Sequence, residues 1–348
     1  MTTRCRTCVY PTTKPDLAFD ETGQCSACTN YFNRPKIDWA ERKKELIALL
    51  DRHDGKCIVP SSGGKDSHYQ VLTLLDLGAD ITIVTARTCM LTEIGRKNID
   101  NLARYARTIE VVPNMKARAK LNRLGLEMVG DISWAEHVAI FTTPFRMAMQ
   151  LGIPLLFYGE NPQNQYGGPV GSERTREMTA RWVFEFGGFL GLRASDVQQM
   201  GFDMRDYTLP EPFDPAIEAH FLGQYLPWDS HQNAAVAEKA GMIQQHPHTS
   251  SWWYFENQDN AQTGIHDYFM YLKYGYGRGC AQISVDVRAG LVSREEALAW
   301  VELYDGIFPE IYMGVHFRDV LEHIGMSRDQ FFDICARYLK QPLTWDGL

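Results

Sequence analysis

A short polar stretch between two apolar runs holds the residues whose types are best suited to chemistry. Residues 57–72 read CIVPSSGGKDSHYQVL, so that Gly63, Gly64, Lys65 and Asp66 follow one another directly. Free backbone N–H groups at the start of a helix attract anions, and glycine leaves no side chain in the way of a bound group. The lysine ammonium adds a positive charge. The stretch therefore predicts an anion-binding loop suited to phosphate groups.

Four of the eight cysteines crowd the first thirty residues. Cys5 and Cys8 form one C-x-x-C pair, and Cys25 and Cys28 form a second. This spacing is typical of a four-thiolate zinc site, in which the metal replaces the core that so short a segment lacks. Two disulfides would need an oxidising compartment, of which the sequence gives no sign. We expect a structural Zn²⁺ in a ribbon spanning residues 1–36, since four thiolates leave no open position for catalysis.

The elements around the polar stretch alternate between short apolar runs and helical periodicity. Strands are predicted at residues 56–60, 79–86, 108–113 and 153–161. Helices are predicted at residues 37–55, 67–78, 92–106 and about 134–150. Such alternation indicates an α/β fold with a parallel sheet covered by helices on both faces. Ligands bind at the carboxyl edge of such a sheet, which is where the loop at 61–66 would lie.

The domain organisation follows from the same patterns. We expect residues 37–215 to form the α/β domain and residues 216–348 to form a mostly helical region that binds substrate or a partner. Residues 170–260 carry no clear helix or strand pattern. The tail is clearer, because residues 293–306 and 327–339 each open with a Ser-x-x-Glu or Ser-x-x-Gln capping box that indicates a helix.

Composition excludes some classes of protein. The formal net charge of −8 argues against nucleic-acid binding, which needs clustered Lys and Arg. The longest apolar stretch is interrupted by Arg146 and Pro154, and the N-terminus does not resemble a secretory signal. We therefore expect a cytoplasmic protein that has no membrane span and no nucleic-acid partner.

The polar loop resembles a known motif. Residues 62–67 read SGGKDS, which matches the SGGxDS loop that holds pyrophosphate in PP-loop ATP pyrophosphatases. The sequence fits neither the Walker A pattern nor GxGxxG. Together with the two C-x-x-C pairs, the motifs TEIGRKN, YGEN, YLKYGYGRG, SREEA and YDG resemble the N-acetyl sugar amidotransferase family over nearly the whole chain. The resemblance implies a Rossmann-like PP-loop ATP pyrophosphatase fold with an N-terminal zinc ribbon and a helical C-terminal region.

The family acts in bacterial O-antigen and flagellin-sugar biosynthesis, and the resemblance implies a reaction. An acetamido group on a nucleotide-activated sugar would become an acetamidino group, for lipopolysaccharide O-antigen or a related surface glycan. An amide oxygen is a poor leaving group, so AMP would be transferred from ATP to that oxygen, and ammonia would then displace AMP. Catalysis of this kind depends on positioning and charge stabilisation.

Roles for the loop residues follow from the resemblance. We expect the departing pyrophosphate to be held by backbone N–H groups and by the Lys65 ammonium. Asp66 would act through Mg²⁺, which prefers carboxylate and phosphate oxygens. Ser67 would contact phosphate, although capping of the helix that follows explains this serine equally well. The residues expected to bind ATP in this loop are Ser61, Ser62, Gly63, Gly64, Lys65, Asp66 and Ser67.

Candidates outside the loop lie at the ends of two predicted strands. Thr85 and Ala86 end the second strand, where the superfamily accommodates adenosine, although a plain strand end is an equally good interpretation. Gly159 is expected to lie beside the nucleotide, Glu160 to be catalytic, and Asn161 to bind substrate. A turn without a catalytic role is the alternative for these three.

Two basic residues are candidates for binding the negative charges of the sugar nucleotide. Lys273 and Arg278 lie in KYGYGRG, whose glycines would allow close approach of a ligand. A solvated glycine-rich loop is the competing interpretation.

The chain carries no recognisable machinery to make ammonia. Thr2 rather than cysteine follows the initiator methionine, and no G-x-C-x-G elbow surrounds any cysteine. We expect a separate glutaminase subunit like that of imidazole glycerol phosphate synthase, with its cyclase-like barrel subunit as a further candidate partner. Direct use of free ammonia is the alternative.

Two other functions compete with amidation. Some tRNA-modifying sulfur transferases also join zinc knuckles to an SGGKDS loop, but no second cysteine pair follows Cys28, and the acidic balance disfavours tRNA. A non-catalytic scaffold that only senses ATP is the other alternative.

Overall fold

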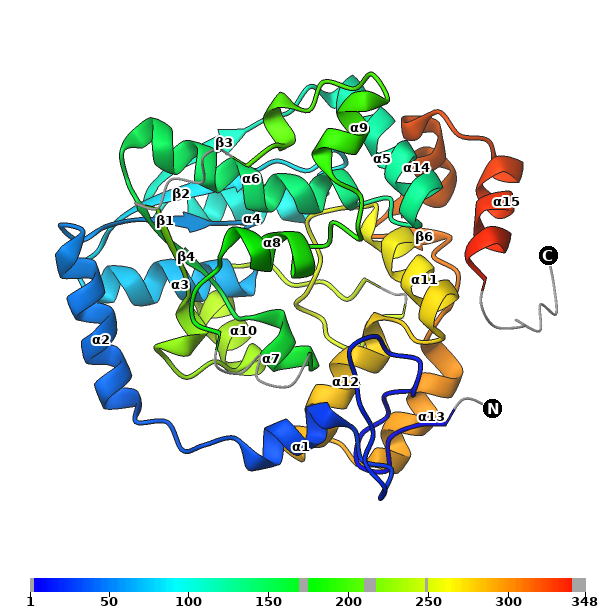
Figure 1. Cartoon of the computed structure of the whole chain (residues 1–348), viewed down its shortest axis with the longest axis horizontal. Coiled ribbons are helices and arrows are strands. Elements are labelled where there is room, and N and C mark those ends of the chain that lie inside the picture. Colours follow the sequence, from blue (N-terminus) through cyan, green and yellow to red (C-terminus); the bar gives the residue numbers. More distant parts are fainter. Residues whose placement is uncertain (1–2, 169–174, 210–216, 248–249, 340–348) are drawn as a thin grey trace.

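A parallel five-stranded sheet lies at the centre of the molecule, in the strand order β3-β2-β1-β4-β5 (Figure 1). The structure is a computed structural model that describes residues 3–168, 175–209, 217–247 and 250–339. The strands are β1 (Lys56–Pro60), β2 (Asp80–Ala86), β3 (Arg107–Val111), β4 (Leu155–Tyr158) and β5 (Glu218–Phe221). The predicted α/β class is confirmed, and four of these strands lie where the apolar runs placed them.

Helices flank the sheet and make up most of the C-terminal part. Those before β5 are α1 (Ser26–Asn33), α2 (Trp39–Arg52), α3 (Lys65–Asp76), α4 (Glu93–Leu102), α5 (Met115–Val129), α6 (Trp134–Leu151), α7 (Pro162–Tyr166), α8 (Ala180–Phe186) and α9 (Ala194–Gln199). Those after β5 are α10 (Ser230–Lys239), α11 (Thr263–Tyr274), α12 (Arg278–Ala289), α13 (Arg294–Tyr304), α14 (Phe317–Ile324) and α15 (Arg328–Tyr338). A short antiparallel hairpin joins β6 (Ile311–Tyr312) to β7 (Val315–His316) before α14.

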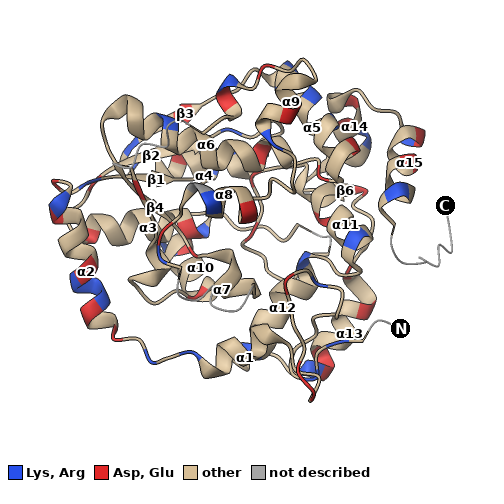
Figure 2. Ribbon diagram, viewed as in Figure 1, with Lys and Arg blue, Asp and Glu red and all other residues tan. Residues whose placement is uncertain are grey.

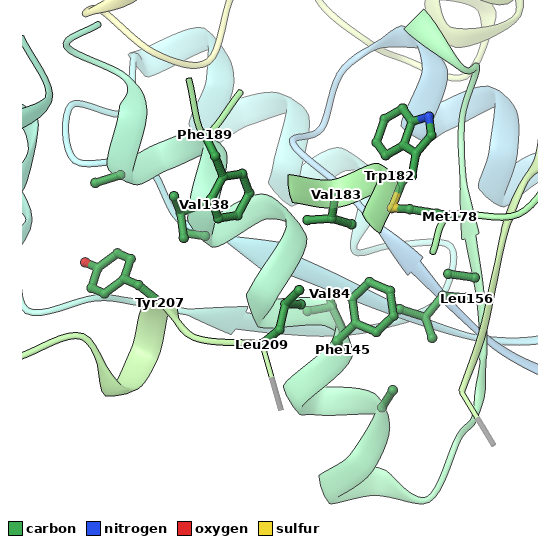
Figure 3. Packing of buried hydrophobic residues seen from close by; sticks show 14 of the residues in the cluster. Val84, Val138, Phe145, Leu156, Met178, Trp182, Val183, Phe189, Tyr207 and Leu209 are labelled. Atoms are coloured by element: carbon green, nitrogen blue, oxygen red, sulfur yellow. The ribbon is translucent and has the colours of Figure 1, made fainter. Parts of the chain in front are cut away.

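The two faces of the sheet carry separate apolar clusters, because successive strand side chains point to opposite sides. Val84 and Leu156 belong to the cluster that packs against α5, α6 and α8, part of which Figure 3 shows around Phe145. Val59 and Phe157 belong to the cluster formed with α2 and α3 on the other face. Both faces of the sheet are thus covered, as the continuous apolar strands require.

The order of the strands creates a switch point between β1 and β4. The chain moves from β1 outward to β2 and β3, then returns to the other side of β1 with β4 and β5. The loops after β1 and β4 therefore leave the sheet in opposite directions, and a crevice opens between them. A ligand is expected to bind in this crevice.

The part of the chain after β4 departs from the predictions in two places. Strand β5 lies within the stretch that showed no pattern, and it carries the sheet past residue 215. The predicted boundary between residues 215 and 216 itself lies outside the described residues, so it stays a prediction. The KYGYGRG stretch is not a free loop, because it ends α11 at Gly275 and begins α12 at Arg278.

Charged residues of both signs are interspersed along the helices in the view of Figure 2. No helix in the described ranges combines the length and apolar character that crossing a membrane requires. The two capping boxes predicted for the tail are confirmed at Ser293 with Glu296 and at Ser327 with Gln330.

Candidate functional site

The SGGKDS loop lies at the switch point, between the end of β1 and the first turn of α3. Gly63 has a φ of 80°, and a Cβ added there would lie 2.8 Å from the backbone nitrogen of Ile99. Ser61 Oγ accepts a hydrogen bond from the Gly63 N–H at 3.0 Å. Only glycine fits at position 63, because the backbone is left-handed there and α4 lies too close for a side chain. The turn leaves the first N–H groups of α3 without intrahelical partners.

Lys65 lies almost completely buried at the start of α3, with 3% of its surface exposed. Its Nζ is 2.6 Å from Asp66 Oδ2 and 3.1 Å from Glu256 Oε1. Burial alone would lower the pKa of Lys65, but the two carboxylates outweigh burial and raise the pKa above its usual value. The ammonium is therefore charged and fixed in direction, as a residue that stabilises a phosphate anion should be.

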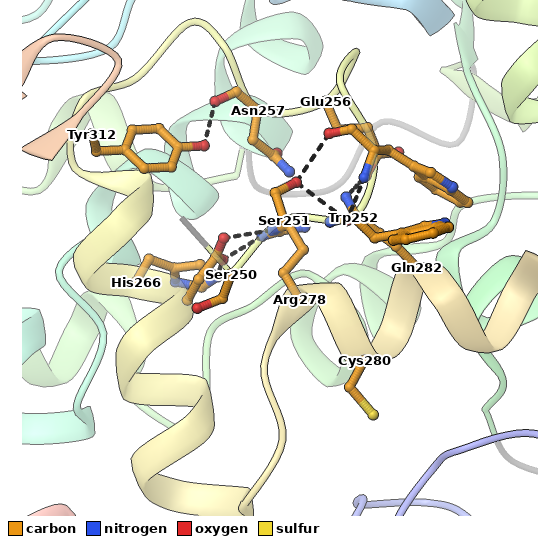
Figure 4. A network of polar contacts seen from close by, with 12 residues as sticks. Ser250, Ser251, Trp252, Glu256, Asn257, His266, Arg278, Cys280, Gln282 and Tyr312 are labelled. Carbon is orange, nitrogen blue, oxygen red and sulfur yellow. Dashed lines mark hydrogen bonds and ion pairs between the residues drawn. The ribbon is translucent and has the colours of Figure 1, made fainter. Parts of the chain in front are cut away.

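Glu256 is the partner of Lys65 that sequence patterns did not identify. Besides the lysine, its carboxylate accepts hydrogen bonds from Tyr166 Oη at 3.1 Å and from Gln282 Nε2 at 2.9 Å. Burial would raise the pKa of Glu256, but Lys65 and Arg278 lower it below the usual value. Figure 4 shows Glu256 within the network that joins it to α12. The loop is thus held in place by a carboxylate from the C-terminal part of the chain.

The second oxygen of Asp66 is also held by a distant residue. Asp66 Oδ1 accepts a hydrogen bond from Asn233 Nδ2 of α10 at 3.0 Å. His68, two residues further along α3, is fully buried, and its Nδ1 lies 3.0 Å from the Gly64 carbonyl oxygen. Burial lowers the pKa of His68, so this histidine is neutral at physiological pH. Both contacts fix the loop against its surroundings.

Two cavities meet at the loop. The first, which we call the loop cavity, has a volume of about 140 Å³. The second, the strand-edge cavity, has a volume of about 290 Å³. Ser62, Asp66, Ser67 and Asp259 line both of them. The loop therefore lies where one extended ligand would pass from one space into the other.

The strand-edge cavity has apolar walls with a few polar groups at its rim. Phe141 and Tyr158 stack in its wall with their ring centroids 5.8 Å apart. Ala86 lines the cavity, and Thr88 Oγ1 beside it is buried without a hydrogen-bond partner. Thr85 is buried and does not line the cavity. Flat apolar walls with a few unsatisfied polar atoms suit a heteroaromatic ring.

Glu160 and Gly159 line the same cavity on the β4 side. Burial raises the pKa of Glu160 to about 8. Its Oε1 accepts hydrogen bonds from the Asn161 N–H at 3.1 Å and from Asn164 Nδ2 at 3.3 Å. The carboxyl group is therefore able to take up or release a proton near neutral pH.

Three further predicted residues have other surroundings. Asn161 is fully buried, and its side chain accepts a hydrogen bond from the Gln163 N–H at the start of α7. Arg278 makes a two-pronged ion pair with Asp267, with both distances at 2.7 Å. Lys273 Nζ donates to the Val129 carbonyl oxygen at 3.3 Å. These three residues line neither cavity, and their assignment to substrate stays a prediction.

The carboxylates beside the loop could hold a hard cation. Asp66, Glu160 and Asp259 all line the strand-edge cavity. Burial raises the pKa of Asp259, a residue that sequence patterns also missed, to about 6. Mg²⁺ is usually bound by one or two carboxylates together with the phosphate oxygens of a substrate. The donor set therefore fits magnesium bound jointly with a phosphate ligand.

The four N-terminal cysteines form a closed cluster. All four are fully buried, and their sulfurs lie within 4.8 Å of one another. The distances from Cys8 to Cys25 and from Cys5 to Cys28 are 3.7 and 3.9 Å. Sulfurs around a tetrahedral zinc with bonds of about 2.3 Å would be about 3.8 Å apart, and a disulfide bond is only about 2 Å long. The geometry therefore fits a structural zinc site and excludes disulfides.

The surroundings of the cluster also suit a metal–thiolate group. Hydrogen bonds from Cys25 and Cys28, with a smaller contribution from the buried Arg288, lower the pKa of Cys8 to about 7. Arg294, the first residue of α13, donates to the carbonyl oxygens of Cys5 and Cys8. Positive charge from α12 and α13 thus lies beside four thiolates.

One comparison with known proteins identifies a relative of part of the chain. Residues 248–347 match the family model described as LPS biosynthesis protein WbpG-like, C-terminal domain. No curated protein matches the chain. The match covers under a third of the chain and includes Glu256 and Asp259, but neither the loop nor the four N-terminal cysteines. It supports the predicted link with lipopolysaccharide biosynthesis.

Proposed function

We propose that the chain is an ATP-dependent amidotransferase of lipopolysaccharide biosynthesis that acts on an acetamido group of a nucleotide-activated sugar. The observation that carries the proposal is the SGGKDS loop at the switch point, with a buried Lys65 ammonium beside two cavities. The family match of residues 248–347 supports the pathway. The substrate and the chemistry rest on the resemblance of the ordered motifs.

ATP would span the two cavities. The adenosine would occupy the strand-edge cavity against Phe141 and Tyr158, near Ala86, and the outer phosphates would bind the N–H groups of the loop. Asp66 would hold Mg²⁺ together with phosphate oxygens. Ser62 and Ser67, which line both cavities, would contact the phosphate chain between them.

The reaction has two steps in this arrangement. The amide oxygen of the acetamido group attacks the innermost phosphorus of ATP, and pyrophosphate leaves toward Lys65. Ammonia then attacks the imidate carbon, the adduct loses a proton, and AMP departs with the former amide oxygen. Glu160 is the carboxylate best placed to accept that proton, since it lines the strand-edge cavity beside Asp66. Charge stabilisation and positioning account for most of the rate in such a scheme.

The role of Glu160 predicts a specific pH profile. Because its pKa is raised to about 8, most of the carboxyl is protonated at pH 7, and the basic form appears as the pH rises toward 8. Amidation should therefore increase across this range, and Glu160→Gln should remove the increase and lower the rate by about 10²-fold. Rates should be measured between pH 6 and 9 at constant free ammonia, so that the ionisation of ammonium does not contribute.

Asn164→Ala provides a matched control. This change removes one hydrogen bond to Glu160 but leaves the carboxyl in place, so the pH-dependent increase should persist and move to higher pH. An unchanged profile in Glu160→Gln would contradict a role for Glu160 as the base.

The partners follow from the chemistry. A nucleotide sugar is the substrate, and a separate glutaminase subunit, joined by a cyclase-like barrel subunit, would supply ammonia in the cytoplasm. Purified chain should therefore use ammonium salts but not glutamine, and addition of the glutaminase should make glutamine a substrate. Full activity of the isolated chain on glutamine would contradict a separate supplier.

Product analysis tests the proposal directly. The chain is incubated with ATP, ammonia and a panel of acetamido sugar nucleotides, and products are analysed by mass spectrometry. One sugar should lose oxygen and gain NH, with one AMP and one pyrophosphate released for each product molecule. Pyrophosphate release without a changed sugar throughout the panel would contradict amidation of these substrates, and binding of ATP without turnover would favour the sensor hypothesis.

The sulfur-transferase alternative finds no support in the positions of the cysteines. Among the described residues, no cysteine lines the loop cavity or the strand-edge cavity. Cys89 lies 2.8 Å from His323 Nε2, whereas Cys280 is buried against the Val9 carbonyl oxygen beside the ribbon. A pair of thiols that could carry sulfur to the loop is thus not formed by the later cysteines in the described ranges.

A further inference from the structure

A second cluster of metal-ligating side chains lies apart from both cavities and from the cysteines. Asp131 precedes α6, His137 lies in the first turns of α6, and His266 lies in α11. Asp131 Oδ2 is 3.0 Å from His137 Nδ1, and Asp131 Oδ1 is 2.7 Å from His266 Nδ1. One ligand atom from each residue lies within 4.8 Å of the other two.

We propose that Asp131, His137 and His266 bind a divalent transition-metal ion. Two imidazoles with one carboxylate suit Zn²⁺, Fe²⁺ or a similar borderline cation rather than Mg²⁺. Neighbouring ligands around a metal with bonds of about 2.1 Å are about 3.0 Å apart at right angles and about 3.4 Å apart in a tetrahedral site. The two nitrogen–oxygen distances, 3.0 and 2.7 Å, are at or below these values, so the side chains would move apart by a few tenths of an ångström to admit the ion.

The groups around the cluster fit a second coordination shell. The Ser133 N–H donates to Asp131 Oδ1 at 2.8 Å and so fixes the carboxylate, which is only 2% exposed. Asp267 Oδ1 lies 3.9 Å from His266 Nε2, which is too far for a hydrogen bond but close enough for electrostatic attraction to the N–H that a histidine bound through Nδ1 keeps.

Nearby positive charge does not prevent binding. Arg278 acts on His137 electrostatically, but its guanidinium makes both short contacts to Asp267, which neutralises it. The side chains of His137 and His266 are 27% and 21% exposed, so an ion can reach them from solvent. Three protein ligands leave positions for water or another small ligand.

The location of the cluster suggests what the ion would do for the fold. His137 comes from a helix of the α/β sheet unit, whereas His266 comes from the stretch that matches the LPS biosynthesis family. A bound ion would therefore cross-link these two parts. It would act independently of the proposed amidation chemistry, since none of the three residues lines the cavities at the loop.

Metal content of the full-length chain tests the proposal. His137→Asn and His266→Asn are combined, because asparagine can still donate a hydrogen bond to Asp131 but is a poor metal ligand. Both proteins are dialysed against a weak chelator, reloaded with Zn²⁺ and measured by elemental analysis. The native chain should hold one equivalent more than the double variant. His231→Asn, which changes a histidine paired with Asp286 outside the cluster, should keep the full content.

Cobalt spectra separate the two sites. Co²⁺ in the cysteine cluster produces thiolate charge-transfer bands, whereas an N₂O site produces only weaker ligand-field bands. The double variant should lose the weak ligand-field bands of the N₂O site and keep both the charge-transfer and the ligand-field bands of the cysteine site. Equal zinc content and identical cobalt spectra in the native chain and the folded double variant would overturn the proposal and leave a purely hydrogen-bonded cluster.

Discussion

Replacing Lys65 with methionine should lower the rate of pyrophosphate release from ATP by about 10²- to 10³-fold, the range typical for removal of one preorganised donor. The ammonium is buried and held between the carboxylates of Asp66 and Glu256. It therefore needs little reorganisation when charge develops on the departing pyrophosphate. Methionine keeps most of the aliphatic side chain, but it has no charge and loses the ammonium that lies 5.6 Å from the centre of the Phe255 ring. Steady-state pyrophosphate release with saturating substrates measures the effect.

The same substitution should destabilise the fold, because it leaves Glu256 buried without its main cation. Removing one member of a buried ion pair costs about 3–5 kcal/mol. The double variant Lys65→Met/Glu256→Gln separates the two effects, since the neutral amide no longer needs a cation. Its free energy of unfolding should recover most of the loss, whereas its activity should stay low. Recovery of activity together with stability would show that Lys65 acts only as a structural residue.

The sequence predicted the parts of the site that lie close together along the chain. The loop from Ser62 to Ser67 joins an apolar strand to a helix, and the two C-x-x-C pairs have a fixed spacing. Each pattern determines its own local geometry: glycine allows the left-handed turn at residue 63, and each pair of cysteines can direct two thiolates to one metal. The loop conformation and the sulfur cluster follow from these local rules.

The contacts that hold the loop could not be predicted, because they come from distant parts of the chain. The contact of Glu256 with Lys65 depends on the packing of the C-terminal helices against the sheet, and so does the contact of Asn233 with Asp66. Neither residue belongs to a recognisable motif. A single sequence does not indicate which of many polar residues tertiary packing brings to a site, so Asp259 was missed as well.

The glycine-rich stretch before α12 shows how one pattern allows two interpretations. Gly275 ends α11 in the left-handed conformation, and the Gly277 N–H donates to Asp305 Oδ2 at 2.7 Å. A Cβ added at Gly279 would lie 2.3 Å from the ring of Trp300. The glycines therefore serve helix termination and close packing in this structure, two uses that spacing alone does not separate from ligand binding.

The N-terminal cysteine cluster is joined to the SGGKDS loop through α12. Arg294 at the start of α13 holds the Cys5 and Cys8 carbonyl oxygens, and Arg4 donates to Cys280 Sγ on α12. On the same helix, Gln282 donates to Glu256, which in turn contacts Lys65. These contacts form a continuous path from the cysteine cluster to the loop. Loss of the metal should therefore affect more than the first thirty-six residues.

Cys8→Ser should release the metal, unfold the ribbon and weaken the packing of α12 and α13. Structural zinc contributes about 10 kcal/mol or more of folding free energy to small domains, which a short ribbon cannot replace. We expect a lower melting temperature, proteolytic cleavage within the ribbon, and reduced affinity for ATP as Glu256 loses its support. A strong chelator should produce the same changes in the native chain, and added Zn²⁺ should reverse them. Cys57→Ser, at a buried cysteine of β1 that lies outside the cluster, should lower stability without making it depend on zinc. If the ribbon of the Cys8→Ser chain resisted protease as well as that of the native chain, the metal could not be what holds the ribbon to α12. The remaining thiolates, Arg4 and Arg294 would then form the contact without an ion.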